Sequence, residues 1–264
     1  MKKILLLFLL ILIFSNAFAQ KLNDKLEYKV TYQLTYKLDS TAQPQSEYMI
    51  LYTGEKLSKF SSRAKILENP IVIRGNSAQT SKAALTKFHY EILKESKSGN
   101  IYYTLKIPKM DDRLYYLEEM NQFEWEILPE TKKIKEFKAQ KAATSFADRN
   151  YIAWFTPEIP IPEGPYKFNG LPGLILEIAD TEDHWIFEFF GLEKLSPKVS
   201  YKLNLNQYVK TDKEKLLELW HRYRKDPIGY ANNPNVTISL ENHKKLVEAF
   251  TEMLGKENTP IELE

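Results

Sequence analysis

The sequence contains no cysteine, which excludes disulfide bonds, thiol chemistry and zinc sites built from thiolates. A lipid anchor of the bacterial lipoprotein type is excluded too, because that anchor needs a cysteine at the processed N-terminus. An excess of one charge is also lacking: 37 Lys and Arg stand against 35 Asp and Glu, and Lys2 and Lys3 at the start account for the difference. This balance excludes a strongly basic nucleic-acid-binding protein. The 264 residues, 43% of them hydrophobic, indicate an ordinary globular protein.

Only one long apolar run occurs, and it lies at the start of the chain. Lys2 and Lys3 precede the run 4–14, and Ala17-Phe18-Ala19 supplies small residues at the −3 and −1 positions of a cleavage site. This arrangement is typical of a secretory signal peptide, and the run is too short to span a bilayer. We therefore expect cleavage after Ala19 and export to the periplasm or cell envelope as a soluble protein, with no transmembrane anchor.

The region after the leader is rich in strand signals. Apolar and polar residues alternate from Leu26 to Leu38, which predicts a half-buried antiparallel strand. Further strands are predicted, separated by turn residues, at 47–53, 56–62, 87–94, 101–107, 113–120, 122–128, 132–146, 150–156, 173–179 and 183–192. The segment 69–86 fits a long loop or a short helix. Short connections favour a curved antiparallel sheet or half-barrel over βαβ units.

In the last fifth of the chain the spacing of apolar residues changes from the alternation of strands to the period of helices. A capping box at Thr211 and Glu214 predicts a helix that ends before Pro227, and a second helix is expected from about Ser239 to Leu254 with Gly255 just beyond it. The predicted fold class is therefore mostly β (α+β), a curved antiparallel sheet or half-barrel with one or two C-terminal helices. We expect a single domain over 20–264, with the helical element at about 211–255.

Proline and glycine concentrate in one segment, Pro157–Gly173, which holds five of the thirteen prolines and three of the nine glycines. Proline fixes φ and removes a hydrogen-bond donor, so the segment is neither an interior helix nor a central strand. One interpretation is a rigid structural lid over one end of the sheet, with a type II turn at Leu171-Pro172-Gly173. The other is a preorganised binding loop.

The hexapeptide Gly170-Leu171-Pro172-Gly173-Leu174-Ile175 resembles the motif that gives the GLPGLI family of exported bacterial proteins its name. The surrounding text is similar to that family over 130–180, and the closing Pro260–Glu264 resembles its usual ending. Relatives often carry a cysteine where this chain has Ala139. The resemblance implies a secreted protein of Gram-negative bacteria with no established activity, encoded near outer-membrane receptor genes. The strands around Trp154 are also similar to the half-barrel of periplasmic lipoprotein carriers.

No pattern for catalysis or metal binding is evident. His89, His184, His221 and His243 lack the spacing of a zinc site, no nucleophile elbow occurs, and no glycine-rich phosphate loop is found. We therefore predict no catalytic residues, no metal ligands and no cofactor. The candidate binding residues are charges and aromatics in or near the proline-rich segment: Arg149, Trp154, Glu158, Lys167, Gly170, Leu171, Pro172, Gly173, Leu174 and Ile175. Arg149 is either a turn residue paired with a carboxylate or a ligand-facing guanidinium, and Trp154 fits the core better than a ligand platform.

Three hypotheses on function remain open. The first is an exported, non-enzymatic protein that binds an apolar small ligand or an envelope or outer-membrane partner. The second is a structural partner of an outer-membrane receptor assembly. The third is an envelope hydrolase whose site is assembled in space.

Overall fold

The computed structural model of the protein describes residues 21–67, 86–108, 112–230 and 239–263. The expected signal peptide and nearly all of the ambiguous segment 69–86 lie outside the described residues. No helix in the described ranges is long and apolar enough to cross a membrane.

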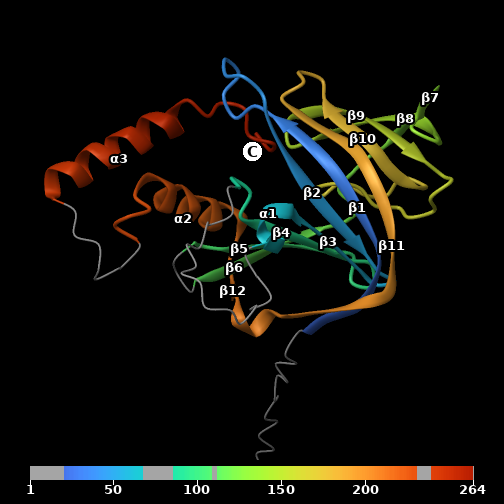
Figure 1. Cartoon of the computed structure of the whole chain (residues 1–264), viewed down its shortest axis with the longest axis horizontal. Coiled ribbons are helices and arrows are strands. Elements are labelled where there is room, and N and C mark those ends of the chain that lie inside the picture. Colours follow the sequence, from blue (N-terminus) through green and yellow to red (C-terminus); the bar gives the residue numbers. More distant parts are fainter. Residues whose placement is uncertain (1–20, 68–85, 109–111, 231–238, 264) are drawn as a thin grey trace, which may run out of the picture.

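Twelve strands form one open, curved sheet, which confirms the predicted mostly β fold (Figure 1). Their order across the sheet is β12-β6-β5-β4-β3-β2-β1-β11-β10-β9-β8-β7, and all pairs are antiparallel except β12 with β6. The strands are β1 (Lys21–Tyr36), β2 (Gln45–Thr53), β3 (Leu57–Ser62), β4 (Tyr90–Glu95), β5 (Asn100–Lys106), β6 (Arg113–Glu119), β7 (Glu126–Ile134), β8 (Phe137–Phe146), β9 (Arg149–Thr156), β10 (Leu174–Asp180), β11 (Trp185–Asn204) and β12 (Val209–Lys210).

Three α-helices accompany the sheet: α1 (Arg63–Leu67), α2 (Lys213–Lys225) and α3 (Leu240–Gly255), with a 3₁₀ turn at Leu205–Gln207. Helix α2 ends before Pro227 as predicted, but its N-cap is Asp212, whose side chain accepts from the Lys215 N–H, and not Thr211. Gly255 is the last residue of α3 and not the residue beyond it, because the chain continues in a right-handed conformation at Lys256.

The strands β1 and β11 are long and form the spine of the sheet. Their register shifts where Leu26 faces Val199 but Tyr28 faces Lys194, so β11 has extra residues at this point. Beyond the shift, the start of β1 and the end of β11 form a two-stranded ribbon that crosses to the left in Figure 1. The predicted strand 183–192 is therefore much longer in the structure.

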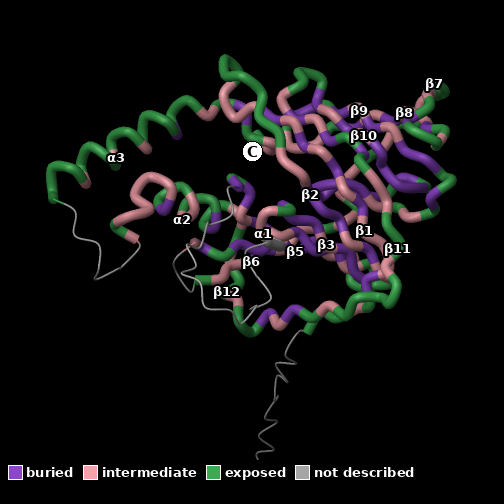
Figure 2. Tube along the Cα trace, viewed as in Figure 1, coloured by how far each residue is buried: buried purple, intermediate pink, exposed green. Residues whose placement is uncertain are grey.

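The alternation of β1 was predicted correctly, and its apolar face lines the concave side of the sheet. Val30, Tyr32, Leu34 and Tyr36 are buried there beside aromatic and aliphatic residues from β2 to β5 and β7 to β11. Buried residues concentrate in this part of the molecule, whereas α3 is mostly exposed (Figure 2).

Two smaller apolar clusters complete the packing. On the outer face, Leu22, Leu203 and Leu205 from the ribbon and the turn after it pack on Leu57, Leu93, Tyr102 and Tyr115. On the inner side, Leu216 and Tyr223 of α2 pack on Leu105, Ile107 and Tyr116. The ribbon thus covers part of the convex face of β3–β6, while α2 covers the concave face of β5 and β6.

The predicted strands 122–128 and 132–146 are placed differently in the structure. Strand β7 begins only at Glu126, and the chain turns at Lys135, which has a φ of 52°. The stretch 132–146 is therefore the end of β7 and all of β8, joined by a tight hairpin in which Ile134 faces Phe137. Its charged residues continue the strand pattern through the turn, so the pattern did not reveal the reversal.

Candidate functional site

The proline-rich loop Pro157–Gly173 fills the concave side of the sheet. Phe168 and Leu171 are fully buried, and Ile159 and Tyr166 are nearly so, all within the main core. The Tyr32 hydroxyl, at the centre of the sheet, donates to the Ile175 carbonyl at 2.7 Å. The loop is therefore an internal plug, and the expectation of a lid over one end of the sheet was wrong.

The hexapeptide 170–175 carries the chain out of the plug and into β10. Leu171, Leu174 and Ile175 are fully buried, and Pro172 is exposed. The Gly173 N–H donates to the Leu171 carbonyl at 2.8 Å, which is a three-residue γ-turn and not the predicted type II turn. At Gly173, φ is 152°, and a Cβ atom would lie 2.1 Å from the Thr156 carbonyl oxygen, so only glycine fits.

Lys94 of β4 holds the first half of the plug from within. Its side chain is completely buried, and Nζ donates to the carbonyls of Gly164 at 3.0 Å and Phe168 at 2.9 Å. Glu163 lies 2.5 Å from the same ammonium. Burial lowers the pKa of Lys94, and the charge of Glu163 opposes that change.

Lys167 holds the second half of the plug and is also completely buried. Its Nζ lies 2.6 Å from Glu118 of β6 and 2.5 Å from Glu262, and it donates to the Tyr116 hydroxyl at 3.2 Å. Four aromatic rings surround the ammonium within 6 Å: Tyr103, Tyr116, Phe146 and Tyr166. We call Lys167, Glu118, Glu262, Tyr116 and Tyr166 the buried network.

The buried network fixes the ionisation of its members. Burial opposes the charged form of Glu262, but the charge of Lys167 and hydrogen bonds from Lys167, Lys213 and Tyr166 leave its pKa below the ordinary value. Burial, followed by the negative charge of Glu262, raises the pKa of Tyr103 and of Tyr166 well above the ordinary value. Glu262 is therefore a carboxylate, and the phenols of Tyr103 and Tyr166 are neutral.

Arg149 and two aromatic residues bind the segment Thr259–Ile261. Arg149 Nε donates to the Pro260 carbonyl at 2.8 Å, the Tyr151 hydroxyl to the Ile261 carbonyl at 2.8 Å, and Trp185 Nε1 to the Thr259 carbonyl at 2.8 Å. The Arg149 guanidinium also pairs with Asp180 at 2.7 Å and is 5% exposed. Of the two interpretations of Arg149, the structure favours pairing with a carboxylate.

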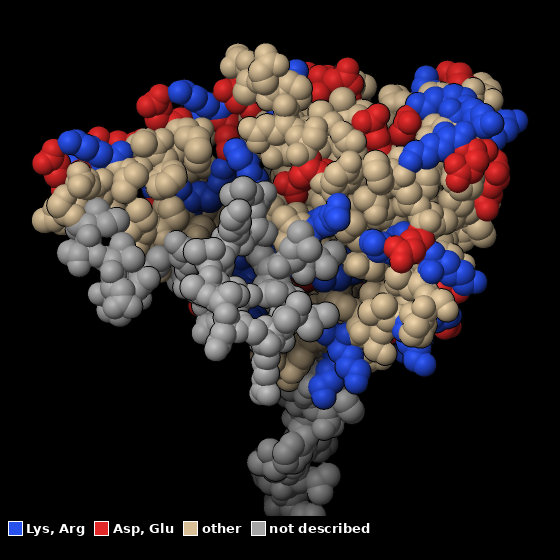
Figure 3. Space-filling model, viewed as in Figure 1, with Lys and Arg blue, Asp and Glu red and all other residues tan. Residues whose placement is uncertain are grey.

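Trp154 and Glu158 lie apart from this interior. Trp154 is on the convex face of β9, where Lys132 Nζ is 4.5 Å from its ring centroid. Glu158 is exposed, and its Oε1 accepts from the Lys138 N–H at 2.9 Å. Lysines and carboxylates intermingle over this end of the sheet (Figure 3). Of the predicted site residues, six are therefore buried in or beside the plug: Arg149, Lys167, Leu171, Gly173, Leu174 and Ile175. Glu158, Gly170 and Pro172 are exposed, and Trp154 is half-buried.

Asp180, Glu182 and His184 converge at the β10–β11 turn, with ligand-type atoms within 4.8 Å of one another. This i, i+2, i+4 spacing joins one histidine to two acids, so the spacing of the histidines alone does not reveal it. The Arg149 guanidinium, however, lies 2.7 Å from Asp180 and 3.7 Å from Glu182. A fixed positive charge beside both carboxylates disfavours a cation there.

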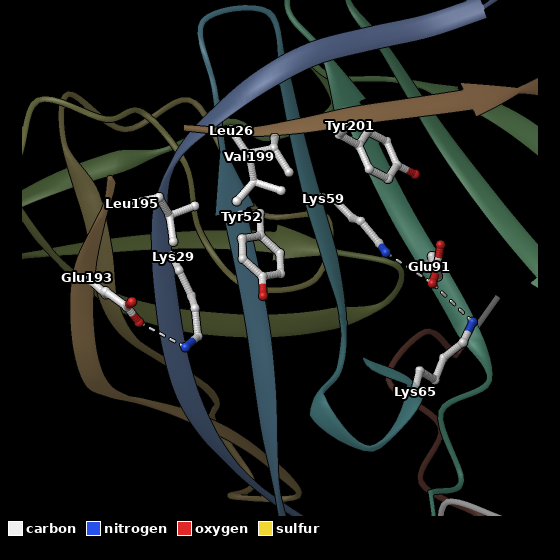
Figure 4. A pocket seen from close by; sticks show the side chains of 10 residues that line it. All are labelled: Leu26, Lys29, Tyr52, Lys59, Lys65, Glu91, Glu193, Leu195, Val199 and Tyr201. Atoms are coloured by element: carbon white, nitrogen blue, oxygen red, sulfur yellow. Dashed lines mark hydrogen bonds and ion pairs between the residues drawn. The ribbon is translucent and has the colours of Figure 1, made fainter. Parts of the chain in front are cut away.

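A pocket of about 440 Å³ lies on the convex side, in the crease between the ribbon and the sheet (Figure 4). We call it the outer pocket. It is lined by Leu26, Lys29, Tyr52, Lys59, Lys65, Glu91, Glu193, Leu195, Val199 and Tyr201.

The strand register explains how these residues come together. Glu193 faces Lys29 across β11 and β1, Lys29 faces Tyr52, and Tyr52 faces Lys59, so the four form a row across neighbouring strands. Directly opposed side chains lie about 5 Å apart at Cβ, and all four point to the same face. Leu195, Val199 and Tyr201 from the ribbon supply the apolar wall opposite the row.

The lysines of the outer pocket are partnered by two carboxylates. Lys29 pairs with Glu193 at 2.9 Å, while Glu91 lies 3.2 Å from Lys59 and 3.6 Å from Lys65. Burial opposes the charged form of Glu91, but the charges of Lys59 and Lys65 leave its pKa below the ordinary value. Among the described residues, three lysines and two glutamates line the pocket.

The outer pocket was not predicted from the sequence. Its charged residues belong to α1 and to the polar faces of β1, β3, β4 and β11, where solvent-exposed lysine and glutamate are the ordinary expectation. The signal that could have indicated the pocket is the ribbon, whose apolar residues Leu195 and Val199 fall beyond the predicted end of the strand. An apolar stretch after a polar strand face indicates a segment that folds back over that face.

Comparison with known proteins gives one family match. The model described as "Protein of unknown function (Porph_ging)", an uncharacterised family of the Gram-negative Bacteroidetes, matches residues 143–177. These residues run from β8 through β9 and the plug into β10. The search of curated proteins found no match. The GLPGLI name therefore stays a prediction from the hexapeptide.

Among solved structures, the chain is similar to PNGF-II in its C2 and P21 crystal forms, with 14% sequence identity and a TM-score of 0.54 in both. The match covers 75% of this chain but only 33% and 34% of those chains, so this chain corresponds to about a third of PNGF-II. A LolA superfamily protein, NE2245 from Nitrosomonas europaea, matches over 65% of this chain and 87% of its own, with 8% identity and a TM-score of 0.28, too low to carry an argument. The likeness to PNGF-II shows that the fold recurs in a part of that protein.

Proposed function

We propose that this is an exported binding protein whose outer pocket takes an apolar ligand with one negative charge. The pocket combines an apolar wall with a row of cationic side chains, and its volume lies within the usual range for small-molecule sites of about 300–1,000 Å³. The observation that carries the proposal is the row of Lys29 and Lys59 beside exposed apolar surface, because Val199 in the wall is 47% exposed.

The ligand would lie along the crease. Its apolar part would cover Leu195, Val199 and the ring of Tyr201, and its anionic group would reach the row formed by Lys29 and Lys59. Lys29 is the better first contact, since its side chain is 32% exposed and its partner Glu193 is 60% exposed. Exposed ion pairs contribute only about 0–1 kcal/mol, so an incoming carboxylate can share this ammonium at little expense.

Binding of a ligand on the concave side of the sheet would require the plug to move out of it. Lys94 and Lys167 hold the plug through completely buried ammonium groups, and breaking such a pair destabilises a protein by about 3–5 kcal/mol. The outer pocket needs no such rearrangement. We therefore place the apolar ligand of the first hypothesis in the outer pocket.

The test is binding of three probes that share a chain but differ in charge: dodecanoate, dodecanol and dodecyltrimethylammonium. Delipidated protein is titrated with each and analysed by native mass spectrometry and calorimetry. We expect dodecanoate to bind most tightly and the cation most weakly. Lys29→Gln should weaken dodecanoate about fivefold, since loss of one charged contact is worth about 1 kcal/mol.

Two variants make this test specific. Val199→Glu places a carboxylate in the apolar wall and should abolish binding of dodecanoate. Lys25→Gln removes an exposed lysine of β1 that does not line the pocket and should leave binding unchanged. Equal binding of the three probes, or binding that Val199→Glu does not affect, would show that the outer pocket is not the ligand site.

A further inference from the structure

A second hollow lies at the far end of the ribbon, where β1 begins. Its volume is about 630 Å³, and it is lined by Lys21, Asn23, Arg113, Lys202, Leu203, Asn204, Gln207 and Tyr208. Three of these side chains are cationic and none is a carboxylate. We call it the basic hollow. In Figure 3 a cluster of Lys and Arg side chains is visible at the lower edge of the molecule, near the start of β1 in Figure 1.

The strand register brings four of its polar residues to one face of the ribbon. Lys21 faces Asn204, and Asn23 faces Lys202. Leu22, between the two β1 residues, is buried in the small outer core and anchors the ribbon. Lys21 and Lys202 are exposed, and within the described ranges neither forms an ion pair, so both ammonium groups can meet a ligand.

Arg113 supplies the third charge from the other side of the hollow. It is the first residue of β6, and its Nη1 donates to Gln207 Oε1 at 3.0 Å. That contact holds the planar guanidinium at the wall and uses only one of its five N–H donors. Like charges gathered without a carboxylate repel one another, so a bound anion would relieve this repulsion.

We propose that the basic hollow binds a phosphorylated sugar or polyol. Lys21, Lys202 and Arg113 match the two negative charges of a phosphate monoester, which lysine binds as a point charge and arginine as a fork. Side-chain amides of Asn23 and Gln207 can donate to and accept from hydroxyl groups. The hollow is far larger than one phosphate ion requires, and the half-buried ring of Tyr208 offers apolar surface to the carbon face of a sugar ring.

This site differs from the outer pocket in chemistry and in place. The outer pocket contains two carboxylates and a longer apolar wall, whereas the described residues that line the basic hollow include three amide side chains and no carboxylate. The two pockets share no lining residue. Substitutions in one should therefore leave ligand binding in the other unchanged.

The experiment titrates the full chain with glucose 6-phosphate, inorganic phosphate and glucose in a buffer of low ionic strength. We expect glucose 6-phosphate to bind at least fivefold more tightly than phosphate, and glucose not to bind. Because the cations are exposed, raising the salt to 0.5 M, where the screening length falls to about 4 Å, should weaken binding at least tenfold. A parallel arm uses phosphatidylcholine vesicles with and without phosphatidylinositol 4-phosphate, and tells a lipid headgroup from a free sugar phosphate.

Lys202→Gln and Lys21→Gln should each weaken glucose 6-phosphate about fivefold without changing the folded state, since neither lysine has a partner among the described residues. Lys25→Gln, on the same face of β1 but outside the hollow, is the matched control and should bind normally. Phosphate binding as tightly as glucose 6-phosphate, or variants that bind like the native chain, would overturn the proposal.

Discussion

The buried network and the outer pocket are both built from lysines facing glutamates, but they lie in opposite environments. In the buried network the side chain of Lys167 is completely buried and that of Glu262 is 8% exposed. In the outer pocket the paired side chains of Lys29 and Glu193 are 32% and 60% exposed. A lysine–glutamate pair is therefore a fixed part of the fold on the concave side of the sheet. On the convex side the lysine can exchange its glutamate partner for a ligand.

The difference follows from the penalty for removing charges from water. An unpaired charge inside a protein is costly, so breaking one partner of a buried pair has a large effect, while an exposed pair contributes little. Charged residues named from sequence are thus poor candidates for ligand binding when the fold buries them among their own partners. Lys167 is such a case, although its place in the proline-rich segment suggested a binding role.

The largest effect is expected from Lys167→Met. Removing the ammonium leaves the Glu118 carboxylate without the lysine it faces and Glu262 with only Lys213, and should lower the free energy of unfolding by about 4 kcal/mol. Urea unfolding followed by tryptophan fluorescence measures the change. Adding Glu118→Gln to this variant should recover part of the loss, because Lys167 is the cation that the structure places against Glu118.

The matched control for the interior is Lys141→Met. Lys141 pairs with Glu130 on the convex face at 3.1 Å, with side chains 26% and 51% exposed, and its loss should change stability by less than about 1 kcal/mol. Similar losses for the two lysines would contradict the comparison.

Gly173→Ala should have the next largest effect, a loss of about 3 kcal/mol. A Cβ atom at this position would overlap the Thr156 carbonyl, which lies 2.1 Å away, and the φ of 152° is one that alanine rarely adopts. Gly99→Ala separates the two causes. Gly99 also has a positive φ, 68°, but open space where its Cβ would lie, so only about 1 kcal/mol should be lost. Thermal unfolding of both variants gives the difference, and equal losses would show that the close approach to Thr156 is unimportant.

A smaller effect is expected at His89, whose carbonyl accepts from Lys65 of the outer pocket at 2.7 Å. Burial, with the nearby charge of Lys65, lowers the pKa of His89 to about 4 from its ordinary value of 6.5. Between these values the unfolded chain binds a proton that the folded chain does not. The contribution of neutral His89 to the free energy of unfolding is therefore fully present above pH 6.5 and is lost as the pH falls toward 4.

Urea unfolding at pH 7 and pH 4.5 tests this dependence. Between these pH values the free energy of unfolding of the native chain should fall by about 2 kcal/mol more than that of His89→Gln. This value follows from about 1.4 kcal/mol for each unit by which the pKa is shifted. His221→Gln replaces an exposed histidine of α2 and should lose as much as the native chain. A His89→Gln variant with the native dependence on pH would show that this ring does not titrate as described.

Local patterns predicted the strands well because alternation is a property of neighbouring residues. The apolar face of β1, from Val30 to Tyr36, was assigned from the sequence and is buried as expected. The destination of the proline-rich loop was not predictable in this way. Its prolines indicate stiffness, but its position inside the sheet depends on Lys94 and Tyr32, which are far away in sequence.

The two sites were harder to predict for the same reason. The partner of Lys167, Glu262, lies 95 positions later in the chain, and no local signal joins them. The outer pocket depends on the bend of β11 after the register shift at Leu26, which brings Val199 and Tyr201 over the polar face of β2 and β3. Sequence alone gives the alternation of that face but not the ribbon that covers it.

The smallest effect on stability, with an opposite effect on binding, is expected from Glu193→Gln. This change removes the exposed carboxylate that competes for Lys29 in the outer pocket and should alter stability by less than about 0.5 kcal/mol. With its partner neutral, Lys29 should bind dodecanoate about threefold more tightly, a gain of about 0.6 kcal/mol. Calorimetric titration of the variant and the native chain measures this change. Glu262→Gln, the corresponding change in the buried network, should lower stability and leave dodecanoate affinity as it was. A Glu193→Gln variant that binds dodecanoate more weakly would mean that the carboxylate, and not the ammonium, faces the ligand, and the two lysine–glutamate pairs would no longer differ in the way that their exposure indicates.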